Sequence, residues 1–231
     1  VRRITPNLQR ITFGGKGMSN FPDNFEGGYV KLNFPQADQG LLQEPIRYFP
    51  AKGEIDIEFV LYNDGRPTSC WAVECKIDDL IKIGGPGPKT LVNPQVDGFT
   101  VGDMTALPAI SVNIEHLHDE VIGYAVTEVI DELTPVTADA EGFEIKWVVN
   151  PKPGEKSGLL IDCVRGITML GGQSSIWVAC EFNAMRILRD YFRTEQQISK
   201  DCLYISSYWK HGSNEDSHRD AKRTDMSALK S

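Results

Sequence analysis

The sequence predicts a small antiparallel β-barrel followed by a parallel α/β domain. In the first ninety or so residues, alternating apolar stretches end at glycine and proline clusters, as short antiparallel strands do. After Pro94, apolar strands alternate with helical patterns, which is typical of a parallel sheet with crossover helices. The 231 residues suit two domains of about 100 residues each. We place them at residues 1–94 and 95–212.

Strands of the first domain are predicted where polar and apolar residues alternate and a turn signal follows. These segments are residues 8–13, 29–34 and 55–62, with a further short strand at 80–83 that ends before the cluster 84–88. One short helix is expected at 68–76, after Pro67 and with Thr68 or Ser69 near its start. Several short strands with one helix indicate a small barrel.

The second domain has a regular alternation of elements. Strands are expected at 99–101, 121–129, 143–149, 176–180 and 203–206, and helices at 106–117, 158–165 and 183–192. In such sheets ligands bind beyond the carboxyl ends of the strands, and Asp103 and Glu181 lie at two of those ends. Residues 213–231 are highly charged without a core pattern, so we interpret them as a charged tail, either a frayed helix or disordered.

The stretch from Gly102 to Ile110 has the clearest ligand-binding pattern. A strand leads into a glycine turn, and Pro108 stands in the first helical turn, where its missing N–H costs nothing. A helix N-terminus offers unpaired N–H groups and the positive end of a dipole, so the turn suits a phosphate or a ribose. The turn is not a G-x-G-x-x-G fingerprint, so a plain dinucleotide fold is not expected.

Composition excludes several classes of protein. The formal net charge of −8 argues against nucleic acid as the main partner. Five cysteines without a C-x-x-C pair favour reduced thiols over a disulfide framework or a zinc site. The chain has no apolar run near the roughly 18 residues of a membrane span, and no charged-then-apolar leader opens it. We therefore expect a cytoplasmic protein, and a monomer.

Six short motifs stand in order along residues 5–216. They are TPNLQRIT (5–12), IEFVLY (57–62), GRPTSCWA (65–72), GDMTALPAI (102–110), WVACE (177–181) and SYWKHG (207–212). Together they resemble the TPxxxRI, DFVLH, GPASxWA, GDETALPAI, WVAGE and GYWRxG motifs of the siderophore-interacting proteins, flavin-dependent ferric-siderophore reductases of the ferredoxin–NADP reductase superfamily. The resemblance implies that the barrel holds FAD and that the α/β domain presents a nicotinamide nucleotide to it.

The main departure from the family lies in its flavin motif, R-x-Y-T-x-R. Here the chain reads RYFPAK from Arg47 to Lys52. Spacing places Phe49 at the aromatic position and Pro50 at the threonine, whereas a one-residue slip would instead place Tyr48 on the flavin ring. Pro50 has neither a hydroxyl nor a backbone N–H, so it cannot donate to the flavin as the family threonine would.

The resemblance implies further cofactor contacts. The guanidinium of Arg47 suits an FAD phosphate, and Thr68 and Ser69 suit the pyrophosphate, with simple N-capping as the alternative. Asp103 and Thr105 would contact FAD and the incoming nucleotide, or Asp103 would cap the helix. The remaining implied contacts are Tyr62, Gly65, Trp71, Ala72, Ala106, Cys180, Glu181 and Trp209. For both tryptophans core packing is the alternative, and a buried cysteine is more often inert.

The implied reaction reduces an Fe(III)-siderophore and releases Fe(II), with electrons from NADH or NADPH passing through FAD. The flavin carries the chemistry, so we assign no side chain as acid, base or nucleophile. Lys52 and Lys210 could form a basic rim for an anionic ferric siderophore in this acidic protein. Asp131 and Glu132 follow the strand that ends at 129, and acids near a ribose favour a free 2′-hydroxyl, hence NADH over NADPH.

Two alternatives stay open at this point. One is a general NAD(P)H diaphorase or ferric reductase that accepts many electron acceptors. The other is a siderophore-binding protein in which the changed flavin motif, Phe49-Pro50, has weakened the flavin site and abolished turnover. A bound, coloured flavin would distinguish a reductase from a binding protein with a weakened flavin site. The range of electron acceptors would distinguish a siderophore reductase from a general diaphorase.

Overall fold

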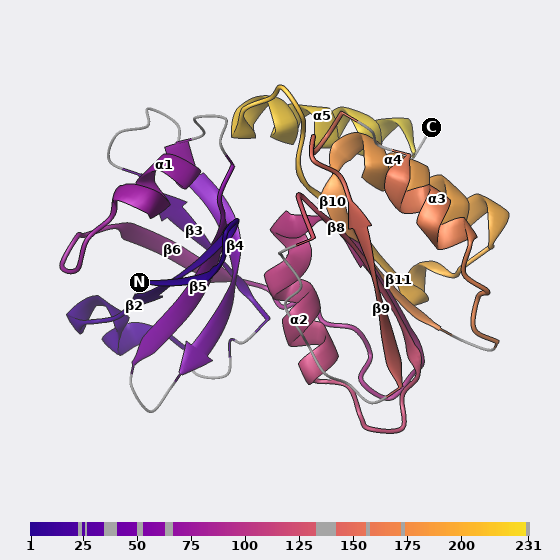
Figure 1. The fold of residues 1–231 in the computed structure, drawn as a ribbon, viewed down its shortest axis with the longest axis horizontal. Coiled ribbons are helices and arrows are strands. Elements are labelled where there is room, and N and C mark those ends of the chain that lie inside the picture. Colours follow the sequence, from indigo (N-terminus) through magenta and orange to yellow (C-terminus); the bar gives the residue numbers. More distant parts are fainter. Residues whose placement is uncertain are drawn as a thin grey trace.

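The structure is a computed structural model that describes residues 1–22, 25, 27–34, 41–49, 53–62, 67–132, 142–155, 158–171 and 174–229, with the backbone alone for residues 41–49. Figure 1 shows two domains side by side, an antiparallel sheet in the first and a parallel sheet in the second. The predicted fold class, a β-barrel followed by a parallel α/β domain, is confirmed. The predicted boundary at residue 94 falls between the last strand of one sheet and the first strand of the other.

Six strands form the antiparallel sheet, in the order β1-β2-β5-β4-β3-β6. Their bounds are β1 (Arg2–Thr5), β2 (Leu8–Phe13), β3 (Tyr29–Asn33), β4 (Leu41–Phe49), β5 (Glu54–Val60) and β6 (Lys82–Gly87). A 3-10 helix, Lys16–Asn20, follows β2, and α1 (Pro67–Glu74) lies between β5 and β6. The strands β1 and β4 lie outside the segments that the alternation pattern predicted.

The interior of this domain is apolar and aromatic. Ile55, Ile57 and Phe59 of β5 are fully buried. Trp71 of α1 packs against the rings of Phe13, Phe34 and Phe59. The helix α1 thus covers the interior of the barrel with its tryptophan.

One strand of the barrel differs from the prediction. The segment expected at 80–83 lies instead at Lys82–Gly87 and runs through the glycines and Pro86. This strand, β6, pairs with β3 at the edge of the sheet. An edge strand tolerates proline because one of its sides needs no ladder hydrogen bonds, so the cluster that read as a stop signal remains in the strand.

Five strands form the parallel sheet, in the order β11-β10-β7-β8-β9, and every neighbouring pair is parallel. They are β7 (Gly98–Gly102), β8 (Gly123–Val129), β9 (Phe143–Val149), β10 (Ser175–Glu181) and β11 (Leu203–Trp209). The helices are α2 (Leu107–Glu115), α3 (Leu159–Arg165), α4 (Phe182–Asp190) and α5 (Glu215–Ala228), with short 3-10 or π turns at 104–106, 191–195 and 200–202.

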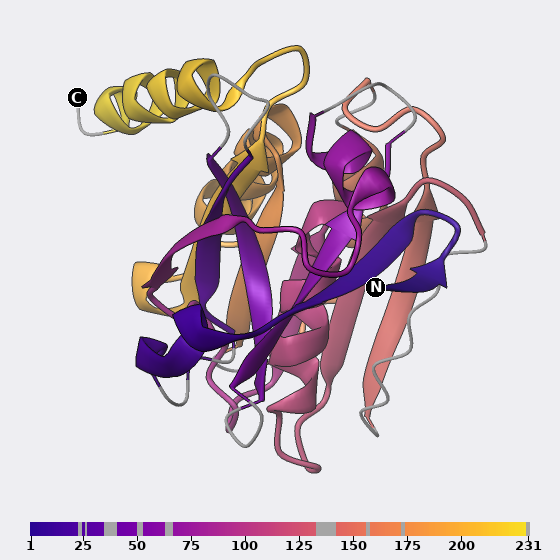
Figure 2. The same ribbon diagram turned by 90° about the vertical axis from the view of Figure 1, so that its left-hand side faces the viewer.

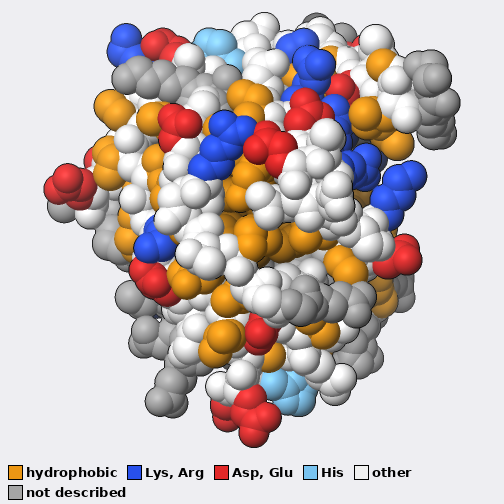
Figure 3. Space-filling view, turned by 90° about the vertical axis from the view of Figure 1, so that its right-hand side faces the viewer, with side chains coloured by type: hydrophobic (Ala, Val, Ile, Leu, Met, Phe, Trp, Pro, Cys, Tyr) orange, Lys and Arg blue, Asp and Glu red, His pale blue; other side chains and the backbone are white. Residues whose placement is uncertain are grey.

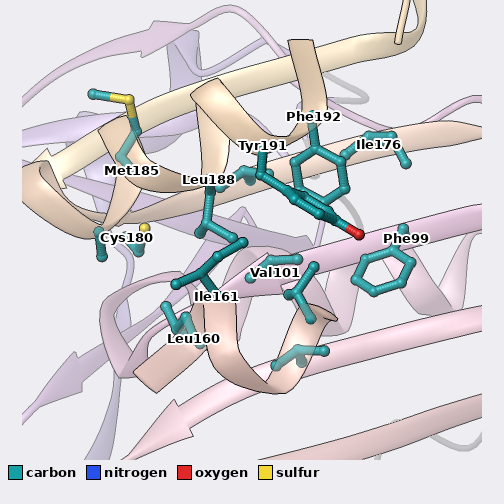
Figure 4. Close-up of a cluster of buried hydrophobic side chains, with 14 of the residues drawn as sticks. Phe99, Val101, Leu160, Ile161, Ile176, Cys180, Met185, Leu188, Tyr191 and Phe192 are labelled. Atoms are coloured by element: carbon teal, nitrogen blue, oxygen red, sulfur yellow. The ribbon is translucent and has the colours of Figure 1, made fainter. Parts of the chain in front are cut away.

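Strand β10 shows how the sheet is covered on both faces. Ile176, Val178 and Cys180 pack with residues of α3 and α4 (Figure 4), whereas Trp177 and Ala179 pack with α2. Alternate residues of a strand point to opposite faces, so both sets are buried. The helix α2 therefore lies between the parallel sheet and the barrel, where it contacts β4, and Figure 2 shows the barrel in front of it.

The charged C-terminal segment forms an ordered helix, α5. Asn214 caps its first turn by accepting from the N–H of Ser217 at 2.9 Å, and His218 is buried with its Nε2 2.8 Å from Ser207 Oγ. The expectation of a frayed helix or a disordered tail is wrong for these residues. The contacting face is made of polar side chains at helical spacing, His218, Lys222 and Asp225, which an apolar pattern does not reveal.

The surface and the helices add two observations. On the face of the α/β domain turned away from the barrel, acidic and basic side chains lie side by side (Figure 3). Such mixing argues against nucleic-acid binding on this face. In the described part of the chain, every helix is too short or too polar to cross a membrane.

Candidate functional site

The carboxyl ends of the central parallel strands meet the barrel at the boundary between the domains (Figure 1). Tyr62 follows β5 and Trp209 ends β11, and their ring centroids are 6.2 Å apart at 47°. Asn7, in the turn between β1 and β2, donates from Nδ2 to Oδ2 of Asp131 at 2.7 Å. One aromatic contact and one hydrogen bond thus join the barrel to the ends of β11 and β8.

A hollow of about 530 Å³ opens on the barrel side of this boundary. It is lined by the β1–β2 hairpin, the end of β5 and the start of α1, through Arg3, Pro6, Asn7, Leu61, Tyr62, Ser69, Cys70, Val73 and Glu74. It offers a guanidinium, which suits phosphate oxygens, and a phenol ring. These two groups suit a cofactor that combines an aromatic ring with a phosphate chain, such as FAD, whereas the carboxylate of Glu74 in the same hollow would repel a phosphate.

The hydroxyl of Ser69 holds the start of α1 against β5. Ser69 is buried, and its Oγ accepts from the N–H of Tyr62 and donates to the carbonyl of Val60, both at 3.1 Å. This hydroxyl is therefore engaged within the protein. Its neighbour Thr68 is half-buried and stays the predicted contact to a pyrophosphate.

Asp103, directly after β7, connects the ends of several elements. Its Oδ1 accepts from N and Oγ1 of Thr105 at 2.9 and 2.6 Å. Its Oδ2 accepts from the N–H of Glu181 and from Nε1 of Trp209, both at 2.8 Å. The side chain is 3% exposed; burial raises its pKa, and the hydrogen bonds from Thr105, Trp209 and Glu181 oppose that rise.

Glu181, at the end of the neighbouring strand β10, has a similar role. Its carboxylate caps α4 by accepting from the N–H groups of Asn183 and Ala184 at 2.6 and 3.3 Å. Its other oxygen accepts from the N–H of His211 at 3.1 Å. The two carboxylates thus fix the segment around Trp209, Asp103 at the indole and Glu181 at the backbone of His211.

A third acid, Glu128 near the end of β8, is part of the same buried group. Burial raises its pKa to about 7, the charges of Asp103 and Glu181 add to the rise, and the neighbouring amide of Asn150 opposes it. Glu128 was not predicted, although a charge inside an otherwise apolar strand was a visible signal. Burial also raises the pKa of Cys180 well above its ordinary value, so its thiol is not a nucleophile.

Other predicted residues lie in the packing around this boundary. Trp71 and Ala72 belong to the barrel core, and Ala106 is fully buried beside Gly102. Lys210 is half-buried, with its Nζ 5.0 Å from the centroid of the Phe182 ring.

For the flavin motif, the structure gives the backbone pairing of strand β4, which contains Arg47, Tyr48 and Phe49. In the pairing of β4 with β5, Arg47 stands opposite Asp56, Tyr48 opposite Ile55 and Phe49 opposite Glu54. The predicted residues Pro50, Lys52 and Gly65 lie outside the described residues. Arg3 and Asn7, which line the hollow, were missed, because a lone exposed arginine and an asparagine in a turn carry no distinctive pattern.

A β-barrel beside a five-stranded parallel sheet is the arrangement of the ferredoxin reductase class of fold. The solved ferredoxin–NADP+ reductase of Plasmodium falciparum matches with a TM-score of 0.66 at 12% identity, covering 87% of this chain and 88% of that one. Family models match too: the siderophore-interacting FAD-binding domain over residues 1–49 and 45–90, and the siderophore-interacting protein over 97–212. The chain belongs to the siderophore-interacting protein family.

Individual relatives agree with this assignment. Ferric vibriobactin reductase ViuB of Vibrio cholerae is 29% identical over 96% of this chain and 91% of its own length. Ferric acinetobactin reductase of Acinetobacter baumannii is 25% identical over 71% of this chain and 58% of its own length. The crystal structure of SipS from Aeromonas hydrophila matches with a TM-score of 0.87 at 28% identity, covering 98% of this chain and 94% of that one.

Proposed function

We propose that this protein reduces ferric siderophores to release Fe(II), with electrons from a nicotinamide nucleotide that pass through bound FAD. The relatives named as ferric vibriobactin and ferric acinetobactin reductases support the substrate class, and the match to an FAD-binding domain supports the cofactor. The observation that carries the proposal is the domain boundary, where the hollow beside the start of α1 is lined by Tyr62 and the ring of Tyr62 contacts that of Trp209.

The chain's own residues bind and orient the cofactor. We assign the FAD phosphates to Arg47 and Thr68 and the flavin ring to Phe49 or Tyr48, with Tyr62 and Trp209 beside it. FAD held there would supply the redox chemistry, the transfer of the two electrons of a hydride from NAD(P)H, one at a time, to two Fe(III) centres. Fe(II) then leaves because hard oxygen ligands hold it less tightly than Fe(III).

A local basic region would attract an anionic ferric siderophore. Lys210 and Lys222 both lower the pKa of His218, so both positive charges act on this histidine beside β11. Lys222 is held by the carbonyl of Ser207 at 3.0 Å, which leaves Lys210 as the contact to substrate. The proposed partner of Lys210 is Lys52, which belongs to the barrel domain in sequence. In a protein with a net charge of −8, a local basic region would steer anions to this site.

The preference for NADH over NADPH belongs to the proposal as well. Asp131 is hydrogen-bonded to Asn7, so its charge is fixed at the domain boundary, and Glu132 beside it is exposed. Two acids at this strand end disfavour a 2′-phosphate. Comparing the rates of flavin reduction by NADH and NADPH tests this assignment, and a faster rate with NADPH would overturn it.

Cofactor binding is the first test of the proposal. The purified protein, reconstituted with FAD where necessary, should show the flavin absorbance near about 450 nm and lose it on addition of NADH without oxygen. The reduced protein, mixed anaerobically with ferric siderophores and a ferrous chelator, should yield Fe(II). A protein that cannot take up FAD contradicts the reductase, and fast reduction of other acceptors without Fe(II) from any siderophore favours the diaphorase.

The basic region can be tested separately. Lys210→Ala should raise KM several-fold for anionic ferric siderophores and leave neutral ones unchanged, because one local charge is lost. Lys200→Ala is the matched control, since this exposed lysine precedes β11 at its opposite end. Equal effects on anionic and neutral siderophores would remove Lys210 from the substrate site.

A further inference from the structure

The carboxylate of Asp103 is fully occupied by donors of the protein itself. A carboxylate has about four lone-pair positions, and four donors point at this one: two from Thr105, one from Glu181 and one from Trp209. The side chain is buried. No acceptor position is left for an FAD or nucleotide group, although the residue lies where a ligand contact was predicted.

The bonds of Asp103 extend across the sheet. Asp103 follows β7, Glu181 ends β10 and Trp209 ends β11, which are three adjacent strands. Neighbouring strands lie about 4.8 Å apart, so β7 and β11 are separated by one whole strand. The indole of Trp209 therefore has to turn back over the end of β10 for its Nε1 to reach Asp103.

Other neighbours limit the same indole ring. Gly154, in the loop between β9 and α3, adopts a φ of +85°, and a Cβ built there would lie 2.8 Å from Cη2 of Trp209. The ring of His211 lies 6.4 Å from the indole, and Tyr62 of the barrel 6.2 Å. The glycine lies at the outer edge of the indole and Asp103 at its nitrogen, while Tyr62 is the neighbour from the other domain.

We infer that Asp103 is a positioning residue that sets the orientation of Trp209, the ring that the α/β domain presents to the flavin at the boundary with Tyr62. This inference rests on the proposed function for the flavin, but the bond between Asp103 and Trp209 is independent of any cofactor. A hydrogen bond to a charged acceptor is stronger than a neutral one, so the carboxylate orients the indole more firmly than an amide or a hydroxyl would.

The first experiment needs no cofactor. In the apoprotein, the indole N–H resonance of Trp209 is identified by its absence from Trp209→Phe. Asp103→Ala should shift it and speed its hydrogen exchange by about ten-fold or more, since a bond to a charged group is lost. Asp103→Asn, which keeps one acceptor oxygen, should restore some of the protection. Thr105→Val is the matched control: it removes a donor to Oδ1 and should leave the indole unchanged.

The second experiment is a double-mutant cycle on the FAD-loaded protein. Asp103→Ala and Trp209→Phe should each change the flavin midpoint potential and lower the rate of its reduction by NADH several-fold, with little change in the KM for NADH. If Asp103 acts through Trp209, the double variant should be no worse than Trp209→Phe alone.

The outcomes separate the inference from the proposed function. An unchanged indole resonance and exchange rate in Asp103→Ala, or effects that multiply in the double variant, would overturn the positioning role. A wild-type protein that takes up no FAD would overturn the proposed function, and the result on the apoprotein would still decide whether Asp103 holds Trp209.

Discussion

Arg189 of α4 and Asp225 of α5 form a two-pronged ion pair. Nη1 donates to Oδ2 at 2.5 Å and Nη2 to Oδ1 at 3.0 Å, and the two side chains are only 8% and 11% exposed. The carboxylate raises the pKa of Arg189, and the guanidinium lowers the pKa of Asp225. A charged helix that looks like a tail in the sequence is thus joined to the α/β domain.

Removing this pair should release α5 and destabilise the domain. Asp225→Ala leaves the buried guanidinium of Arg189 without its partner, and breaking a buried pair in this way costs about 3 kcal/mol. Urea unfolding would measure the loss. Asp220→Asn is the control, because Asp220 and Arg223 form an exposed pair at 3.7 Å that contributes less than about 1 kcal/mol. Equal midpoints for the two variants would contradict a docked α5.

The imidazole of His218 makes the stability of the protein depend on pH. Burial lowers its pKa to about 4, with Lys222 and Lys210 adding to the shift. The ordinary value is about 6.5, so the unfolded chain binds a proton that the folded protein does not between these values. The stability that this group contributes is fully present above pH 6.5 and is lost as the pH falls towards 4, by up to about 3 kcal/mol.

The matched variant for this group is His218→Gln, whose amide can still meet Ser207 Oγ and does not titrate. Compared with the wild type, this variant should gain stability as the pH falls from 6.5 to 4, because the loss that His218 contributes is absent. Urea unfolding at several pH values measures the free energy of unfolding of the wild type and of the variant. Parallel pH profiles for the two proteins would show that His218 titrates as it does in water.

Glu128 should act in the opposite direction. Its pKa is raised to about 7, first by burial and then by Asp103 and Glu181, so the folded protein binds a proton that the unfolded chain releases. Stability from this group is fully present below pH 4.5 and is lost as the pH rises through 7. Glu128→Gln should therefore be more stable than the wild type at pH 8, by up to about 3 kcal/mol, and no more stable at pH 4.

These two groups titrate over nearly the same range with opposite signs. The wild type should therefore show little net change between pH 4.5 and 6.5 from the pair, whereas each single variant should show a slope. Thermal unfolding at half-unit pH steps would measure how the stability of the wild type and of each variant changes with pH. If stability changed with pH in the same direction in His218→Gln and Glu128→Gln, the pKa shift of one of the two groups would be contradicted.

Much of this fold was predictable because its strands follow simple patterns. The predicted bounds of β2 and β9, 8–13 and 143–149, agree with the structure. The helix α5 was not predictable as a docked element, because His218 and Asp225 attach it through polar contacts. Strand β6 was misplaced because edge position, which makes Pro86 acceptable, is a property of the sheet and not of the segment.

The site was predictable in its residues more than in their partners. The strand pattern placed Asp103 and Glu181 at two strand ends, and the motifs gave Trp209 as a flavin contact; the structure brings these three into contact. Which donors would occupy Asp103 depends on strand order, since Trp209 reaches it across β10, and strand order is not written in any local pattern. Tyr62 and Trp209 were both predicted as flavin contacts, but their proximity follows from the way the two domains meet.

Gly102 should be the position in the strand–helix turn that tolerates substitution least. A Cβ there would lie 2.7 Å from both the Cβ of Ala106 and the carbonyl oxygen of Ala179, which are packing and backbone atoms that cannot move aside cheaply. Gly102→Ala should therefore cost about 1–3 kcal/mol through overpacking, and it should displace Asp103, which follows directly. Gly17→Ala is the control, because a Cβ at Gly17 meets no atom within 4 Å. Urea unfolding would measure the loss of stability, and the Trp209 indole resonance would report the displacement of Asp103. A Gly102→Ala protein as stable as Gly17→Ala would show that the turn accommodates a Cβ at Gly102.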